Sequence, residues 1–134
     1  MLSERPTMEE MEAFFNGDQF ATKAAGCRIV EGWKGHAVAE MDLAEIHKNA
    51  QGNIMGGAIF TLADFALAIA SNIGTGPAVN AMSTITYLSA TRGEKLIATA
   101  DCEKAGRRLG FYAVRVTDDT GKLIAKMDVT VCPV

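Results

Sequence analysis

The chain has 134 residues, of which 49% are hydrophobic and 22% charged, and it carries a net charge of −3. This length suits one folded domain with a single core, and the composition is globular, not disordered. The net negative charge argues against a general nucleic-acid-binding protein, which would carry an excess of basic residues. We therefore expect one domain over residues 1–134, with residues 1–20 as an N-terminal helical segment.

The sequence also indicates the cellular location of the protein. The first residues contain no basic region followed by an apolar one, so no secretory signal is evident. The longest apolar stretch, residues 58–70, is shorter than the roughly 20 residues of a membrane span. Cys27, Cys102 and Cys132 are an odd number without a C-x-x-C pair, which indicates neither a disulfide framework nor a zinc site. We expect a cytoplasmic protein without a membrane partner, metal or cofactor.

A short amphipathic helix is predicted near the N-terminus. Thr7 is a candidate N-cap, and Glu10 stands three residues later, as in a capping box. Apolar residues recur at helical spacing from Met8 to Phe15, and Asn16-Gly17 is a typical helix end.

Most of the remaining chain is typical of β-structure. Residues 27–43 are predicted to form a hairpin with its turn at residues 33–35. After the breaker "GTGP", four stretches rich in Val, Ile, Thr and Tyr are separated by turn sequences. Their ranges are 78–90, 95–105, 109–119 and 122–134. We expect an α+β fold in which these four strands form a meander, with Asp118 on the solvated surface.

The stretch from Ile59 to Ala70 is predicted to be a buried helix. Its apolar side chains cover nearly every direction around the helix axis, which is typical of an enclosed helix. Asp64 interrupts this surface, and a lone buried carboxylate is costly unless it gains partners or a raised pKa. Either a backbone amide or basic group satisfies Asp64, or the carboxylate has a chemical role.

Gly56 and Gly57 stand where this helix should begin. A helix N-terminus presents unpaired N–H groups, and glycine lets a ligand approach the backbone closely. Such a site can polarise a carbonyl or hold an oxyanion, although two glycines alone are also typical of a tight turn.

The spacing of Gly57 and Asp64 carries a further consequence. Seven residues place both on nearly the same helix face but about 10 Å apart along the axis. This separation is too large for both to act on one carbonyl group. If both are catalytic, the simplest arrangement is a twofold dimer in which the helix start of one subunit faces the aspartate of the other.

The pattern H-x-N-x-x-G-x-x-x-G-G-x-x-x-x-L-x-D resembles the signature of the PaaI-type hot-dog acyl-CoA thioesterases. It comprises His47, Asn49, Gly52, Gly56, Gly57, Leu62 and Asp64. The resemblance extends over about residues 21–131. It implies an antiparallel sheet curled around one long central helix, and a homodimer or homotetramer whose active sites are shared across the interface.

The resemblance also implies roles for individual residues. The backbone of Gly56 and Gly57 would polarise the thioester carbonyl, and Asn49 would position that oxygen or the attacking water. Asp64 of the facing subunit would act either as general base or as nucleophile. Asn80 is the nearest match for a polar residue that assists the water, with Ser83 and Thr84 as substitutes.

Further residues are expected around the substrate. His47 is either a near-site residue or a loop-ordering one, and the acyl pocket is expected to use Phe60, Phe65 and Met82. Many relatives have histidine where this chain has Met55, which cannot shuttle a proton. Met55 is expected to contact the substrate, and its presence implies either a more apolar acyl pocket or slower turnover.

The phosphates of coenzyme A would need cations. Arg107 and Arg108 are adjacent at a predicted turn and are candidates for this contact. The alternative is that they are ordinary solvent-exposed residues of a turn.

Three functions therefore remain open. The first is hydrolysis of a small or medium aliphatic or aryl acyl-CoA to the acid and coenzyme A. The second is a non-catalytic acyl-CoA-binding module on the same fold, which Met55 favours. The third is a hot-dog hydratase, which would depend on a histidine such as His47 and not on Asp64.

Overall fold

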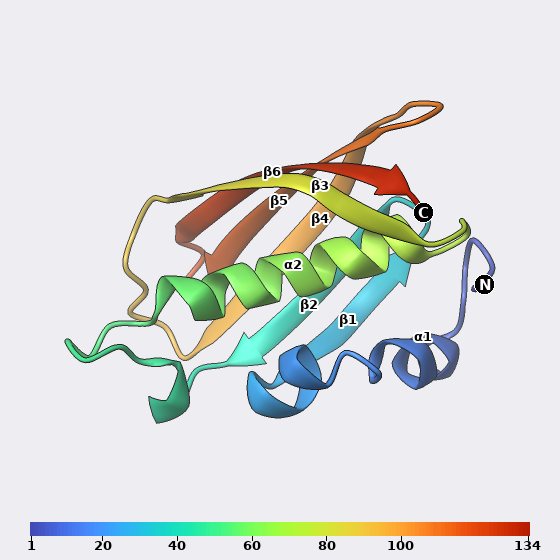
Figure 1. Cartoon of the computed structure of the whole chain (residues 1–134). Coiled ribbons are helices and arrows are strands. Elements are labelled where there is room, and N and C mark those ends of the chain that lie inside the picture. Colours follow the sequence, from blue (N-terminus) through green and yellow to red (C-terminus); the bar gives the residue numbers. More distant parts are fainter.

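The computed structural model describes all 134 residues as one curved sheet with a long helix on its concave face (Figure 1). The two helices are α1 (Met8–Phe15) and α2 (Gly56–Asn72). A π-helical turn at Phe20–Ala24 and a 3-10 turn at Glu45–His47 complete the helical elements. The strands are β1 (Cys27–Trp33), β2 (His36–Asp42), β3 (Ala78–Tyr87), β4 (Lys95–Ala105), β5 (Gly110–Asp118) and β6 (Leu123–Pro133).

Local sequence signals account for the predicted element positions. Thr7 caps α1 and forms the expected capping box with Glu10, and the helix ends at Asn16. The first hairpin turns between Trp33 and His36, where Gly35 adopts a φ of +84° that favours glycine. These predictions are confirmed, as is the start of the long helix at Gly56.

The order of strands corrects the predicted meander. All neighbours are antiparallel in the order β1-β2-β4-β5-β6-β3, so β3 lies at one edge beside β6 and not beside β4. Only β4, β5 and β6 form a meander. Turn sequences mark where strands end, but which edges pair depends on packing between segments distant in the chain. The strand after α2 is therefore left with one free edge.

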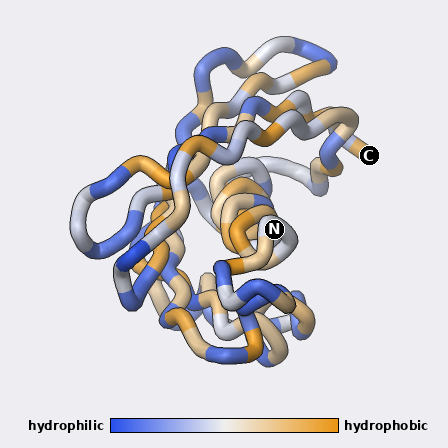
Figure 2. Tube along the Cα trace, turned by 90° about the vertical axis from the view of Figure 1, so that its left-hand side faces the viewer, coloured by the Kyte–Doolittle hydropathy of each residue, from blue (hydrophilic) through white to orange (hydrophobic).

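The sheet buries α2 on most of its faces. Figure 2 looks roughly along this helix and shows the strands curving around it. A single cluster of 26 buried hydrophobic residues joins α2 to the sheet and includes Leu62, Leu67 and Ile69 of the helix. Burial of such side chains stabilises a fold by about 1.5–3 kcal/mol each. No helix of the chain combines the length and apolarity that crossing a bilayer requires.

One stripe of α2 is less covered than predicted. Gly57 is exposed, and Thr61, Asp64 and Ala68 are only partly buried. These four positions recur at helical spacing, so they share one side of the helix. The expectation of a helix enclosed all round therefore fails along this stripe, which contains Asp64.

Asp118 is not the surface residue that the sequence indicates. Its side chain is 2% exposed and accepts hydrogen bonds from Thr91, from Thr120 and from the backbone of Lys122. Burial alone would raise its pKa, but these hydrogen bonds lower the pKa to about 2. Asp118 thus fastens the β5–β6 turn to the segment that precedes β4.

His36 forms a charged cluster at the start of β2. Its Nδ1 lies 2.6 Å from Asp101 Oδ1 and its Nε2 lies 2.7 Å from Glu31 Oε2. Two carboxylates accept from both ring nitrogens only if the imidazole is protonated. Burial opposes this charge, but the hydrogen bonds with Asp101 and Glu31 outweigh it and raise the pKa of His36 above 6.5.

We predict that His36 makes stability depend on pH. Its folded pKa is raised, so its contribution is fully present below about pH 6.5 and is lost as the pH rises through the folded value. His36→Gln should therefore lower the free energy of unfolding by about 1 kcal/mol near pH 6, and the deficit should shrink toward pH 9. Urea unfolding at several pH values measures this difference, and a deficit independent of pH would contradict it.

Candidate active site

The N-terminus of α2 leaves two backbone donors free. Met55 is the N-cap with extended backbone geometry, and its side chain makes no capping hydrogen bond. The N–H groups of Gly56 and Gly57 donate to no loop, turn or side-chain acceptor in the chain. Since the first N–H groups of a helix also lack intrahelical partners and lie at its positive end, they can bind an oxyanion.

The two glycines differ in their surroundings. Tyr87 Oη donates a 3.0 Å hydrogen bond to the Gly56 carbonyl, and a Cβ added at Gly56 would lie 3.1 Å from Tyr87 Cζ. At Gly57 an added Cβ would meet only Met55 Cγ, at 4.0 Å. Gly56 is thus small because Tyr87 packs against it, whereas Gly57 faces open space. Tyr87 is not evident as a site residue from the sequence, because no local pattern links it to the helix start.

Asn49 shapes the loop that leads into α2. Its Oδ1 accepts hydrogen bonds from the N–H groups of Gln51 at 3.0 Å and Asn53 at 3.1 Å. Its Nδ2 donates to no acceptor in the chain. The oxygen is therefore used to order the loop, and only the amide nitrogen remains available to a ligand.

His47 orders the same loop from inside the protein. Its side chain is 6% exposed, Nδ1 accepts from the Ala44 N–H at 3.0 Å, and Nε2 lies 2.6 Å from the Ala25 carbonyl. A carbonyl only accepts, so Nε2 carries the proton and the ring is neutral. Both nitrogens are occupied. The assignment of His47 to substrate binding does not fit this geometry, whereas the loop-ordering alternative does.

Asp64 and Asn80, both expected at the active site from the family resemblance, lie in contact within one chain. Asn80 Nδ2 donates a 2.7 Å hydrogen bond to Asp64 Oδ1. No cation pairs with Asp64. Burial raises the pKa of this carboxyl above its usual value, and the hydrogen bond from Asn80 offsets part of the rise. A partly desolvated carboxylate held by one amide is suited to accept a proton or attack a carbonyl.

A pocket of about 460 Å³ opens beside Asp64. It is lined by residues of the N-terminal segment and of α2, namely Asp18, Gln19, Phe20, Ala21, Phe60, Thr61, Asp64 and Phe65. Phe60 and Phe65, two of the residues expected to contact the acyl group, line this pocket beside Asp64. Gly56 borders a different pocket of about 440 Å³, together with Tyr87 and Leu88. Within one chain the helix start and Asp64 do not share a cavity.

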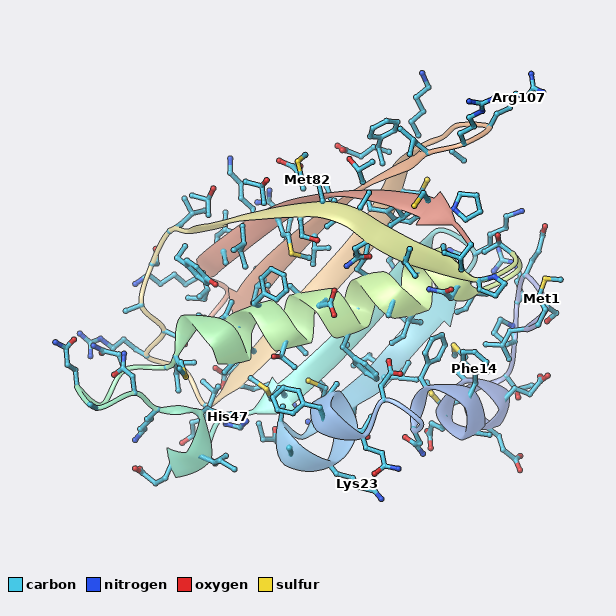
Figure 3. The ribbon with its side chains drawn as sticks, viewed as in Figure 1. Met1, Phe14, Lys23, His47, Met82 and Arg107 are labelled. Carbon is cyan, nitrogen blue, oxygen red and sulfur yellow. The ribbon has the colours of Figure 1, made fainter.

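Met82 corrects the predicted acyl pocket. Figure 3 shows it on the side of β3 away from α2, and it is 61% exposed. The register of β3 with β6 shifts between Asn80 and Met82, which marks a β-bulge. Because a bulge reverses the alternation of side chains, Asn80 points to the helix and Met82, two residues later, does not.

Arg107 and Arg108 lie at the other end of the molecule from the start of α2. Figure 3 shows Arg107 and His47, which precedes α2, at opposite ends. Both arginines line a pocket of about 460 Å³ with Lys34, Ala78 and residues at the C-terminal end of α2. This pocket shares no lining residue with the pocket at Gly56 of the same chain.

Other chemistries have no corresponding site. No group of three or more His, Cys, Asp or Glu side chains is placed to hold a metal ion. The three cysteines are unpaired, and burial raises the pKa of Cys27 to about 12, which makes its thiolate rare. Asp64, Asn80 and the helix N-terminus thus form the candidate active site.

An antiparallel sheet curved around one long central helix is the arrangement of a hot-dog fold. The chain belongs to the thioesterase superfamily, whose family model matches residues 51–125. The structure of the PaaI protein of Escherichia coli, from the phenylacetic acid degradation operon, superposes with a TM-score of 0.83. The two are 25% identical, and the match covers 96% of both chains. The expected PaaI-type family is confirmed.

Sequence relatives agree with this assignment. Human acyl-coenzyme A thioesterase 13 is 33% identical over 122 residues, which are 88% of this chain and 87% of that protein. A relative from Archaeoglobus fulgidus is 40% identical over 99 residues, which are 73% of this chain. That match spans 64% of the archaeal protein, slightly less than two thirds of its length.

We predict opposite stability effects for alanine at the two glycines. At Gly56, Tyr87 must shift to admit a methyl group, at a cost of about 1–2 kcal/mol. At Gly57 the space is open, and the better helix propensity of alanine should add up to ~1 kcal/mol. Urea unfolding of Gly56→Ala and Gly57→Ala measures both. A stabilised Gly56→Ala protein would show that Tyr87 does not constrain the helix start.

Proposed function

We propose that this protein hydrolyses acyl-CoA thioesters, with a small or medium aliphatic or aryl acyl group, to the free acid and coenzyme A. The observation that carries the proposal is Asp64, a partly desolvated carboxylate without a cation, held by Asn80 on the one uncovered stripe of α2. Membership of the thioesterase superfamily, and a relative named as an acyl-coenzyme A thioesterase, support the same reaction.

In this reaction the free N–H groups of Gly56 and Gly57 stabilise the negative charge that develops on the thioester oxygen. Asp64 acts either as base, taking a proton from water as the water oxygen bonds to the carbonyl carbon, or as nucleophile. The nucleophilic route gives a mixed anhydride that water then cleaves. In both routes the carbon–sulfur bond breaks and the coenzyme A thiolate leaves and takes up a proton. Asn80 orients the carboxylate.

The helix start and Asp64 are joined in this proposal by a second copy of the chain. Asn80, near the start of β3, donates a hydrogen bond to Asp64. Tyr87, at the end of β3, donates a hydrogen bond to the carbonyl of Gly56. An antiparallel pairing of β3 with the same strand of another copy brings Asp64 of one subunit toward Gly56 of the other. The free edge of β3 and its exposed apolar side chains favour this pairing, and two such dimers would make a tetramer.

The same pairing gives Arg107 and Arg108 access to the ligand. Their pocket borders Ala78, the first residue of β3, and antiparallel pairing places that end beside Tyr87 of the other subunit. With Lys34 they would supply three positive charges near the partner's helix start. We propose that this pocket holds the phosphates of coenzyme A, because guanidinium groups bind phosphate oxygens in pairs.

Met55 supports the second candidate, a binding module without turnover. Its side chain is 54% exposed at the N-cap and cannot transfer a proton. The hydratase alternative loses its acid–base residues instead. Both histidines of the chain are held by hydrogen bonds at both ring nitrogens, His47 with backbone groups and His36 with carboxylates.

The first experiment is thiol release from a panel of acyl-CoAs by the wild type and Asp64→Asn. An amide can neither accept the proton nor attack the carbonyl, so we expect kcat to fall at least ~100-fold. Below the raised pKa of Asp64, wild-type activity should fall as well, because the carboxylate is then protonated.

Asp128→Asn is the matched control, since it makes the same chemical change at an exposed residue of β6 and should leave kcat unchanged. Sedimentation at micromolar concentration checks that both variants keep the oligomer of the wild type. A monomeric wild type would contradict the shared site. Binding of acyl-CoA without turnover in any variant would favour the binding module.

The phosphate pocket has a separate kinetic signature. Arg107→Ala combined with Arg108→Ala should raise KM about tenfold or more, with kcat nearly unchanged, because the phosphates lie far from the reacting carbonyl. Arg115→Ala, at an exposed residue of β5, is the control and should leave KM unchanged. A drop in kcat without a change in KM would place the two arginines outside the phosphate site.

A further inference from the structure

The pocket beside Asp64 contains a second carboxylate that the reaction does not use. Asp18, from the segment before the π-helical turn, lines this pocket with Phe20, Phe60 and Asp64. The backbone carbonyl of Asp18 accepts hydrogen bonds from the N–H and hydroxyl of Thr22, so local structure is held by the main chain. Its carboxylate has no hydrogen-bond donor and no cation among the side chains of this protein.

The carboxylate of Asp18 interacts electrostatically with the pocket that it lines. Burial raises the pKa of this carboxyl, and the negative charge of Asp64 raises it further. The two carboxylates therefore interact electrostatically across the same cavity. Asp18 and Phe20 are exposed and lie at the solvent edge of the pocket, whereas Phe60 is part-buried and Phe65 is buried. The charge of Asp18 therefore acts at the edge of the pocket, where solvent screens it in part.

We propose that Asp18 is a specificity-determining residue, which makes the pocket accept neutral acyl groups and reject acyl groups that end in a carboxylate. The inference rests on the proposed function in that it takes this pocket as the acyl site. A neutral chain meets aromatic walls, whereas an anionic chain end meets the unpaired negative charge of Asp18 and no cation among the lining residues. A protein can reject a competing ligand by placing an unpaired like charge where that ligand would bind.

The test compares two substrates that differ only at the chain end. Pentanoyl-CoA and glutaryl-CoA both carry five-carbon acyl groups, and the second ends in a carboxylate. The wild type should have a kcat/KM at least about a hundredfold higher for pentanoyl-CoA. In Asp18→Asn this ratio should fall at least about tenfold, and in Asp18→Lys it should fall further. The amide variant removes no hydrogen bond, so it should fold as the wild type does.

Glu12→Gln is the matched control. It removes one negative charge from α1, at an exposed residue outside the pocket, and should leave the ratio unchanged. An unchanged ratio in Asp18→Asn, or an equal change in Glu12→Gln, would overturn the proposal.

Failure of the proposed function would give a different experimental result from failure of the Asp18 proposal. If no variant releases thiol from any acyl-CoA, hydrolysis is excluded, but dissociation constants of the same two thioesters still test Asp18. Titration calorimetry should then show weaker binding of glutaryl-CoA to the wild type and a smaller difference for Asp18→Asn. Equal affinities of the wild type for both thioesters would overturn the selectivity.

Discussion

The structure depends on the burial of α2, a helix whose apolar side chains point in almost every direction. Such a helix is stable in water only if other elements cover most of its surface. One flat sheet can cover a single face, so the strands must curve around it. The curved sheet ends at β3, and the stripe of α2 that contains Asp64 stays only partly covered. The curvature of the sheet therefore both stabilises the fold by burying α2 and leaves Asp64 accessible at the candidate site.

Partial burial makes Asp64 costly for the stability of the fold and, at the same time, useful for the chemistry. Desolvation disfavours the charged carboxylate, and a single amide from Asn80 does not fully compensate. A cation would compensate better, but it would also hold the carboxylate and weaken it as a base. The complementary positive element is the start of α2, which lies too far along the same helix to neutralise Asp64. In the proposed dimer, two antiparallel copies would bring Asp64 of one subunit near the positive helix start of the other.

Asn80 is expected only from the family resemblance, whereas local patterns in the sequence are enough to place the helices, the first hairpin and Asp64 on the long helix. They failed where a single residue changes the geometry of distant ones. The bulge after Asn80 reverses the facing of Met82, and no composition signal marks it. Asp18 and Tyr87 were likewise invisible, because their proximity to α2 arises only when the N-terminal segment and the end of β3 pack against it.

Met55 shows how little the proposed carbonyl site depends on side chains. It caps α2 without a side-chain hydrogen bond, yet the helix starts at Gly56 with its first donors free. The positive end of a helix arises from aligned peptide groups, so it does not depend on whether methionine or the histidine that the family resemblance leads us to expect stands at the N-cap. What the histidine could add is proton transfer, and the thiolate of coenzyme A is a good enough leaving group to need little of it. The replacement therefore bears on the rate of the reaction more than on whether the site can perform it.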